Sequence, residues 1–77
     1  MVEAYILIQA EVGKAARIAA EVGKIDGVAQ SAAVMGPYDV VVHVTADDND
    51  ALGNLVVAKI QAVEGVTRTL ACPVVRI

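Results

Sequence analysis

The chain has 77 residues and a net charge of −3, and 57% of its residues are hydrophobic although only 3% are aromatic. This length allows one small domain, residues 1–77, whose core is marginal unless a disulfide, a metal or oligomerisation supports it. The single cysteine excludes an intrachain disulfide, and one His and one Cys are too few ligands for a structural zinc. The six basic residues are scattered along the chain, which disfavours direct binding to nucleic acid.

The first half of the chain predicts a strand, a helix and a second strand. Val2–Ala10 is apolar on both alternating faces, as in a strand that is buried on both sides. After Gly13, apolar residues follow the i, i+3, i+4, i+7 spacing of an amphipathic helix, at Ala15, Ile18, Ala19 and Val22. Residues 28–35 are small and apolar, and they predict the second strand.

The second half predicts a hairpin, a helix and a last strand. Gly36-Pro37-Tyr38-Asp39 is a tight connection to a third strand over Val40–Ala46, which makes an antiparallel hairpin. The acidic run at residues 47–50 is typical of a helix start, because short acceptor side chains cap free N–H groups there. Residues 66–77 predict the final strand, and Pro73 near its end indicates a sheet edge or a bulge. The stripe that the second helix buries is Leu52, Leu55, Val56, Ile60 and Val63.

Two turns of similar sequence lie 38 positions apart. Ile25-Asp26-Gly27-Val28 and Val63-Glu64-Gly65-Val66 each follow a helix pattern and precede a strand, which indicates two copies of one βαβ unit. The order β-α-β-β-α-β predicts an α+β, ferredoxin-like fold. In that fold a four-stranded antiparallel sheet has its first and third strands in the centre and both helices on one face.

The other face of this sheet carries apolar side chains, among them Tyr5, Leu7, Val41 and Val75. A stable monomer avoids such a contiguous apolar patch, so we expect two sheets to pack face to face in a homodimer. No apolar run approaches the ~20 residues that span a bilayer, and the N-terminus lacks the basic segment of a signal peptide. We therefore expect a cytoplasmic protein with no membrane contact.

Three motifs in this order resemble a known family. The segment Val34-Met35-Gly36-Pro37-Tyr38-Asp39-Val40 resembles the strand–turn–strand signature in the effector domain, or RAM domain, of the Lrp/AsnC family of amino-acid-responsive transcription regulators. Ile25-Asp26-Gly27-Val28 and Val63-Glu64-Gly65-Val66-Thr67-Arg68-Thr69 resemble the two flanking turns of that domain. The resemblance covers essentially the whole chain.

The resemblance implies a non-enzymatic module that binds a small effector, typically an amino acid. We expect no cofactor and no metal. In that family the domain dimerises through its sheet, dimers often assemble into octamers, and effectors bind between neighbouring dimers. Because the chain starts directly at the first strand of the domain, we expect a stand-alone RAM protein without the DNA-binding helix-turn-helix. We expect such a protein to alter the assembly or effector response of full-length Lrp/AsnC regulators and not to bind an operator itself. The identity of the effector and the choice between dimer, octamer and open array stay open.

The expected ligand-binding residues are Met35, Gly36, Pro37, Tyr38 and Asp39 in the hairpin, and Thr67 and Thr69 in the last strand. In this hypothesis Asp39 binds the ammonium group of an amino acid, Tyr38 forms a wall with a polar tip, and Gly36 lets the ligand approach the backbone. Thr67 or Thr69 binds the carboxylate or the amine. The structural alternative is a plain β-turn with Pro37 at its second position, in which Asp39 bonds a nearby backbone N–H.

Other polar residues have structural interpretations. His43 is expected on the dimer face, Cys72 as a small buried hydrophobe, and Arg68 in an ion pair with an acid such as Glu64 or across the dimer. Two further functions stay open. One is a small dimeric ferredoxin-like enzyme of monooxygenase or isomerase type, for which His43 is the sole acid–base candidate near neutral pH. The other is a purely structural assembly module.

Overall fold

The computed structural model describes residues 1–76, and its elements follow the predicted order. The strands are β1 (Val2–Ala10), β2 (Val28–Ala33), β3 (Val40–Ala46) and β4 (Val66–Pro73). The helices are α1 (Ala15–Val22) and α2 (Asn49–Asn54), and α2 continues directly into a π-helical segment, η1 (Leu55–Ile60). The strands β2 and β4 are shorter than predicted, and Ile77, which the predicted final strand included, lies outside the described residues.

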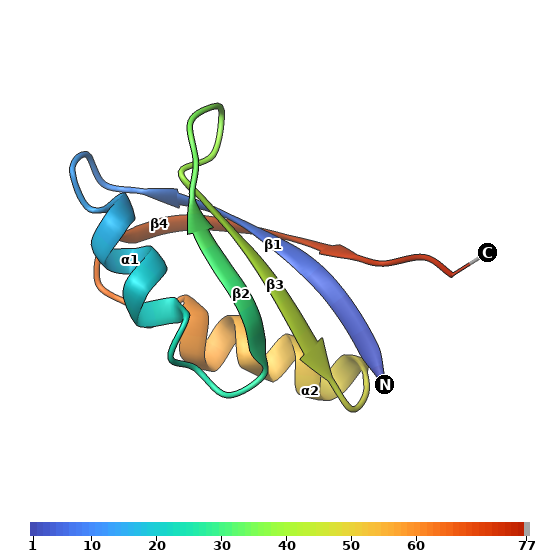
Figure 1. Cartoon of the computed structure of the whole chain (residues 1–77). Coiled ribbons are helices and arrows are strands. Elements are labelled where there is room, and N and C mark those ends of the chain that lie inside the picture. Colours follow the sequence, from blue (N-terminus) through green and yellow to red (C-terminus); the bar gives the residue numbers. More distant parts are fainter. Residues whose placement is uncertain (77) are drawn as a thin grey trace.

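The four strands form one antiparallel sheet in the order β2-β3-β1-β4, with the first and third strands in its centre (Figure 1). Both helices lie on the same side of this sheet. The predicted ferredoxin-like α+β fold is therefore confirmed. In the register Ile8 of β1 lies between Val40 of β3 and Thr69 of β4, and this end of the sheet also carries the 34–39 hairpin.

The core lies between the helices and one sheet face. Along β1, buried and accessible side chains alternate strictly from Glu3 to Ile8, as expected for a strand whose two faces meet different surroundings. Each fully buried Ile or Val contributes about 1.5–3 kcal/mol to the free energy of folding. The buried residues are Ala4, Ile6, Ile8, Ile18, Val22, Val40, Val42, Val44, Leu52, Leu55, Val56 and Ile60.

The two repeated turns have the same backbone geometry. Gly27 and Gly65 both have φ of 96°, in a region that residues with a side chain rarely adopt. At Gly65 a Cβ atom would also lie 2.9 Å from Lys14 Cδ and 3.1 Å from Ile18 Cδ1. Each turn follows a helix and leads the chain back into the sheet, before β2 and before β4. The repeated sequence therefore corresponds to a repeated turn structure.

The second helix starts as predicted and then widens. Asp48 caps it, because its Oδ1 accepts a hydrogen bond from the backbone N–H of Ala51 at 2.8 Å. In its last turns the N–H of Gln61 donates to the carbonyl of Val56 at 2.9 Å, which is the i→i+5 bond of a π-helix. Leu55, Val56 and Ile60 are buried against the sheet, as the predicted stripe requires, whereas the sequence did not predict the π-helical turn.

Replacing Gly53 by alanine is expected to stabilise the domain by about 0.5–1 kcal/mol, because a helical glycine loses more backbone entropy on folding than alanine. Gly53 is exposed, and a Cβ atom built on it meets nothing within 4 Å. Urea unfolding of Gly53→Ala measures the change. Gly65→Ala is the matched control and is expected to destabilise by at least about 1 kcal/mol, since φ is positive and the space is filled. Equal effects at the two positions would contradict this account.

The sheet face opposite the helices is uncovered in the protomer, as predicted. Tyr5 is 47% exposed and Leu70 43% exposed, and both lie on this open face together with Leu7 and Val41. Cys72 pairs with Tyr5 across β1 and β4 and is exposed, so the expectation that it is buried was wrong. The error arose because Cys72 lies beside Tyr5 on the open face of the sheet, which the helices do not cover. Among residues 1–76, no helix is long and apolar enough to cross a membrane.

Candidate functional site

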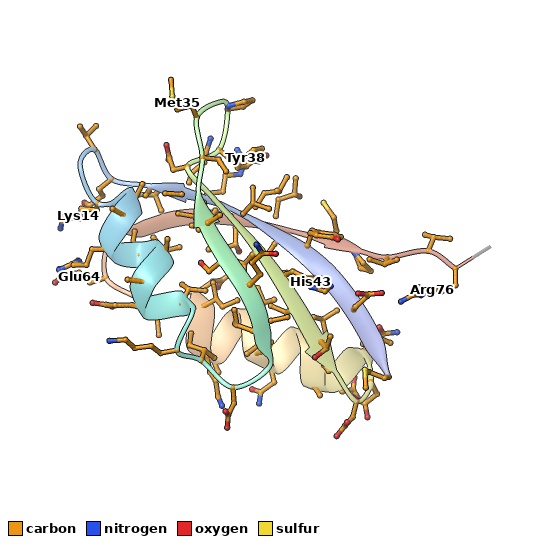
Figure 2. The ribbon with its side chains drawn as sticks, in the orientation of Figure 1. Lys14, Met35, Tyr38, His43, Glu64 and Arg76 are labelled. Carbon is orange, nitrogen blue, oxygen red and sulfur yellow. The ribbon has the colours of Figure 1, made fainter. Side chains whose placement is uncertain are left out.

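The β2–β3 hairpin ends in a six-residue loop, residues 34–39, rather than in the tight four-residue turn that was predicted. The N–H of Val34 donates to the carbonyl of Asp39 at 2.9 Å and closes the loop. Within it, Gly36 has φ of 148°, which favours glycine. Strand β2 ends at Ala33, two residues before the predicted end. Figure 2 shows Met35 at the outer end of the loop and Tyr38 nearer to the sheet.

Asp39 anchors this hairpin to the end of β1. Its Oδ2 accepts a hydrogen bond from the backbone N–H of Ala10 at 2.8 Å, and its own N–H donates to the carbonyl of Ile8 at 2.8 Å. The carboxylate is half-buried. The structural alternative for Asp39, a bond to a nearby backbone N–H, is therefore present in the fold.

Gln9 connects the hairpin to β4, and the sequence reasoning missed it. The Nε2 of Gln9 donates to the carbonyl of Pro37 at 3.2 Å, and its own carbonyl accepts a bond from the hydroxyl of Thr67 at 3.1 Å. The sequence could have indicated a role for Gln9, since Gln9 and Glu3 are the polar residues in an otherwise apolar strand.

Thr69 lies on the helix side of β4. Its Oγ1 accepts a hydrogen bond from Nε2 of Gln61 at 2.8 Å, just after η1. A cavity of about 360 Å³ is present here, lined by Gln61, Val66, Thr67, Arg68 and Thr69. Gln61 was not predicted as a site residue, because its role depends on where the π-helical turn ends.

The fold brings the predicted site residues to one end of the sheet, but in two groups. Asp39 bonds β1 from the β3 side. On the β4 side, the hydroxyl of Thr67 bonds the carbonyl of Gln9, and Thr69 pairs with Ile8 in the sheet. Tyr38 is half-buried near the base of the hairpin, and Met35, Gly36 and Pro37 are exposed. Because β1 separates the two groups, they do not form one enclosed pocket within the protomer.

Glu64 joins the turn before β4 to helix α1. Its carboxylate lies 2.9 Å from Arg17 Nη2 and 3.7 Å from Lys14 Nζ, and Figure 2 shows Lys14 and Glu64 together at the end of α1. The hydrogen bond from Arg17 and the charge of Lys14 hold the pKa of Glu64 below its usual range, and the bond to Glu64 raises the pKa of Arg17. The expected pairing of Arg68 with Glu64 was wrong, since α1 supplies the cations that face this turn.

Lowering the pH is expected to destabilise the wild-type protein more than the Glu64→Gln variant. The pKa of Glu64 is lower in the folded state, so its contribution is present above the ordinary carboxyl range and is lost as the pH falls through the lowered pKa. Thermal unfolding at pH values from about 6 down to about 3 measures the difference. In the exposed control Asp47→Asn the pH dependence should stay that of wild type, and a Glu64→Gln variant that also matches wild type would contradict the prediction.

The open face carries a polar cluster beside its apolar residues. His43 Nε2 lies 2.6 Å from Glu3 Oε2, and the other carboxylate oxygen of Glu3 pairs with Arg76. The His43 ring stacks on the ring of Tyr5, with centroids 5.0 Å apart. Figure 2 labels His43 and Arg76. His43 therefore lies on the face predicted for it. A shallow cavity of about 280 Å³ beside it is lined by Tyr5, Gln30, Ala32, Val34, Val41 and His43.

A further cavity, of about 410 Å³, lies at the other end of β3 from the hairpin. Its lining includes Asp26, Thr45 and Asp47 together with Lys59. None of the predicted site residues lines this cavity, so it does not support the predicted site.

Comparison with known proteins gives one family and a set of similar structures. The model of the Lrp/AsnC ligand binding domain matches residues 3–77. The protein TTHA0845 from Thermus thermophilus is similar with a TM-score of 0.93 and 30% identity, over 100% of this chain and 96% of that one. AsnC of E. coli gives a TM-score of 0.90 and 22% identity, over 99% of this chain and 52% of that one. No curated protein matches.

One similar structure contains a ligand. The transcriptional regulator NMB0573 from Neisseria meningitidis, solved as a complex with L-Met, has a TM-score of 0.85 and 25% identity, over 97% of this chain and 50% of that one. The chain thus spans about half the length of AsnC and of the Neisseria regulator.

The family match includes the hairpin and both repeated turns, so the resemblance predicted from these motifs is confirmed. The similarity to the Thermus protein over the full chain extends this agreement to the fold. The chain belongs to the family of Lrp/AsnC ligand-binding domains.

Proposed function

We propose that this domain is a non-enzymatic sensor that binds a free α-amino acid through the hairpin and the start of β4. The observation that carries this proposal is the half-buried carboxylate of Asp39, which the Ala10 N–H holds at the sheet end. The family supports a small ligand, and the L-Met complex of the Neisseria regulator supports an amino acid.

Asp39 suits the ammonium group of an amino acid. Within the described residues, its one side-chain hydrogen bond uses Oδ2, which leaves the acceptor capacity of Oδ1 for a ligand. A bond between an ammonium group and a carboxylate is charge-assisted and about twice as strong as a neutral one. In this proposal Tyr38 packs beside the ligand, exposed Gly36 allows close approach to the backbone, and Met35, Pro37, Thr67 and Thr69 complete the site.

The same proposal includes assembly through the open face. Leu7, Val41 and Leu70 are neighbours in the register and form an apolar band along this face, which a second copy of the sheet would cover. Dimers then associate further, and an effector that binds better to one packing of dimers shifts the population toward it. In the cytoplasm, such a module would alter the assembly of full-length Lrp/AsnC regulators.

Titration calorimetry with each of the twenty amino acids, combined with light scattering, tests the proposal. We expect at least one amino acid to bind and to change the distribution of oligomers. If no amino acid binds and the oligomer stays constant throughout, the sensing function is wrong and a purely structural module is favoured.

A further inference from the structure

We propose that the polar cluster on the open face, formed by His43, Glu3 and Arg76, makes the pairing of two copies depend on pH, so that protonation of His43 separates the dimer. This inference rests on the assembly step of the proposed function and deepens it, since it gives a regulatory role to the face that a second copy covers. None of the residues proposed to bind the effector belongs to this cluster.

The row of open-face residues that contains His43 lies directly beside the apolar band. Across the sheet, one row consists of Ala32, Val41, Leu7 and Leu70, and the next consists of Gln30, His43, Tyr5 and Cys72. One row is about 19 Å wide and about 7 Å high, because strands are about 4.8 Å apart and two residues of a strand span about 7 Å. A stable interface buries about 800 Å² on each partner, so a second sheet that covers the apolar band also covers the row of His43.

The charges around His43 balance only while its ring is neutral. Nε2 of His43 lies 2.6 Å from Oε2 of Glu3, and the other carboxylate oxygen of Glu3 pairs with Arg76. With a neutral ring, the Nε2–H group donates to Glu3, and the charges of Glu3 and Arg76 cancel. A second proton on the ring leaves the cluster with an uncompensated positive charge. The side chains of His43 and Glu3 are only 26% and 22% exposed in the protomer, so a second sheet leaves little water to solvate that charge.

The other groups that face His43 do not offset this charge. From β1, the Tyr5 ring stacks on the imidazole, from β2 the uncharged Gln30 pairs with His43, and from β4 Cys72 lies beyond Tyr5. Tyrosine and cysteine side chains ordinarily titrate above about pH 8, and carboxylates near about pH 4. His43 is the only histidine in the sequence, and histidine is the side chain whose charge ordinarily changes between about pH 5 and about pH 8.

The free protomer and the dimer therefore bind protons differently. In the free protomer the open face is in contact with water, which solvates a protonated cluster. In the dimer two such clusters would be desolvated at one interface, where an uncompensated charge is costly and like charges repel. The dimer thus holds fewer protons than two free protomers, so lowering the pH shifts the equilibrium towards the protomers. Loss of the net charge of −3 on acidification would act in the opposite direction.

Analytical ultracentrifugation of the wild type and three variants at two pH values tests the inference. We expect the dissociation constant of the wild-type dimer to rise at least about tenfold from about pH 7.5 to about pH 5.5, since two protons per dimer allow up to about 100-fold per pH unit. In His43→Gln, whose amide can still donate to Glu3, we expect a change of less than about twofold.

The variant Arg76→Gln is expected to reverse the response. Without Arg76, protonated His43 and Glu3 form a pair with no net charge, so the dissociation constant should fall as the pH falls. Lys24→Gln is the matched control: it removes the same charge from an exposed position in the turn after α1 and should respond like wild type. Circular dichroism at both pH values checks the fold of each variant. If His43→Gln does not fold, the response of Arg76→Gln decides.

Three results would overturn the inference. They are a wild-type dissociation constant that does not rise at the lower pH, a rise that His43→Gln shares, and an Arg76→Gln response with the same sign as wild type. If the wild type is monomeric at both pH values, the proposed assembly through the open face is wrong as well. If the dimer responds as expected but calorimetry detects no amino acid binding, the sensing function is wrong and the pH-dependent dimer stands.

Discussion

Replacing Asp39 by alanine is expected to weaken amino-acid binding by at least about tenfold and to lower the free energy of unfolding by about 1–3 kcal/mol. Binding falls because the ligand loses its anionic partner. Stability falls because the N–H of Ala10 loses the acceptor that it contacts at 2.8 Å in a partly buried position. Calorimetry measures the first effect, and urea unfolding measures the second.

Asp39→Asn separates these two roles. The amide oxygen of asparagine still accepts a bond from the Ala10 N–H, so we expect a loss of stability below about 1 kcal/mol. The negative charge is gone, so binding is still expected to fall by about tenfold. An Asp39→Asn protein that binds amino acids like wild type would show that Asp39 only anchors the hairpin to β1.

Most of the fold could be predicted because its signals are local and periodic. The apolar runs Val2–Ala10 and Val40–Ala46 gave the strand bounds correctly, and the repeated turns with Gly27 and Gly65 indicated the order of the elements. The cap at Asp48 was also predicted, since an N-cap depends on a few neighbouring residues.

The errors concern features that depend on distant contacts. The hairpin was predicted as a four-residue turn, but its loop comprises residues 34–39, and Asp39 at its end bonds Ile8 in β1. Cys72 was expected to be buried, but the pairing of β4 with β1 places it beside Tyr5 on the open face. The π-helical segment Leu55–Ile60 was not predicted either, since its apolar residues also fit the spacing of an ordinary α-helix.

The predicted site residues all lie at one end of the sheet, but the sequence did not predict that β1 divides them into two groups. The hairpin motif and the threonines of β4 were recognised by family resemblance, and the fold places them on either side of β1. The roles of Gln9 and Gln61 were not predicted, because no sequence motif marks a glutamine that bonds a distant segment. Their roles appear only when the Pro37 carbonyl and the Thr69 hydroxyl lie within hydrogen-bond distance.

The second large effect is expected from a charge on the open face. Leu7 lies in the central strand β1, with Val41 and Leu70 as its neighbours in the register, so Leu7→Glu puts a carboxylate in the middle of the apolar band. In a face-to-face dimer, two such carboxylates would be desolvated close together, and like charges at an interface cost several kcal/mol. We expect the dissociation constant of the dimer to rise at least about 100-fold, measured by analytical ultracentrifugation.

The protomer itself should keep its fold in this variant, because Leu7 faces away from the helices and is not part of the buried core. Circular dichroism at a concentration where both proteins are monomeric checks this point. Ala16→Glu is the matched control: it adds the same charge on the exposed side of α1 and is expected to leave the dimer intact. If Leu7→Glu remains as dimeric as wild type, the open face is not the interface. If both variants dissociate, net charge rather than the position of the charge controls assembly. The proposed coupling of effector binding to the packing of dimers would then need an interface other than the sheet.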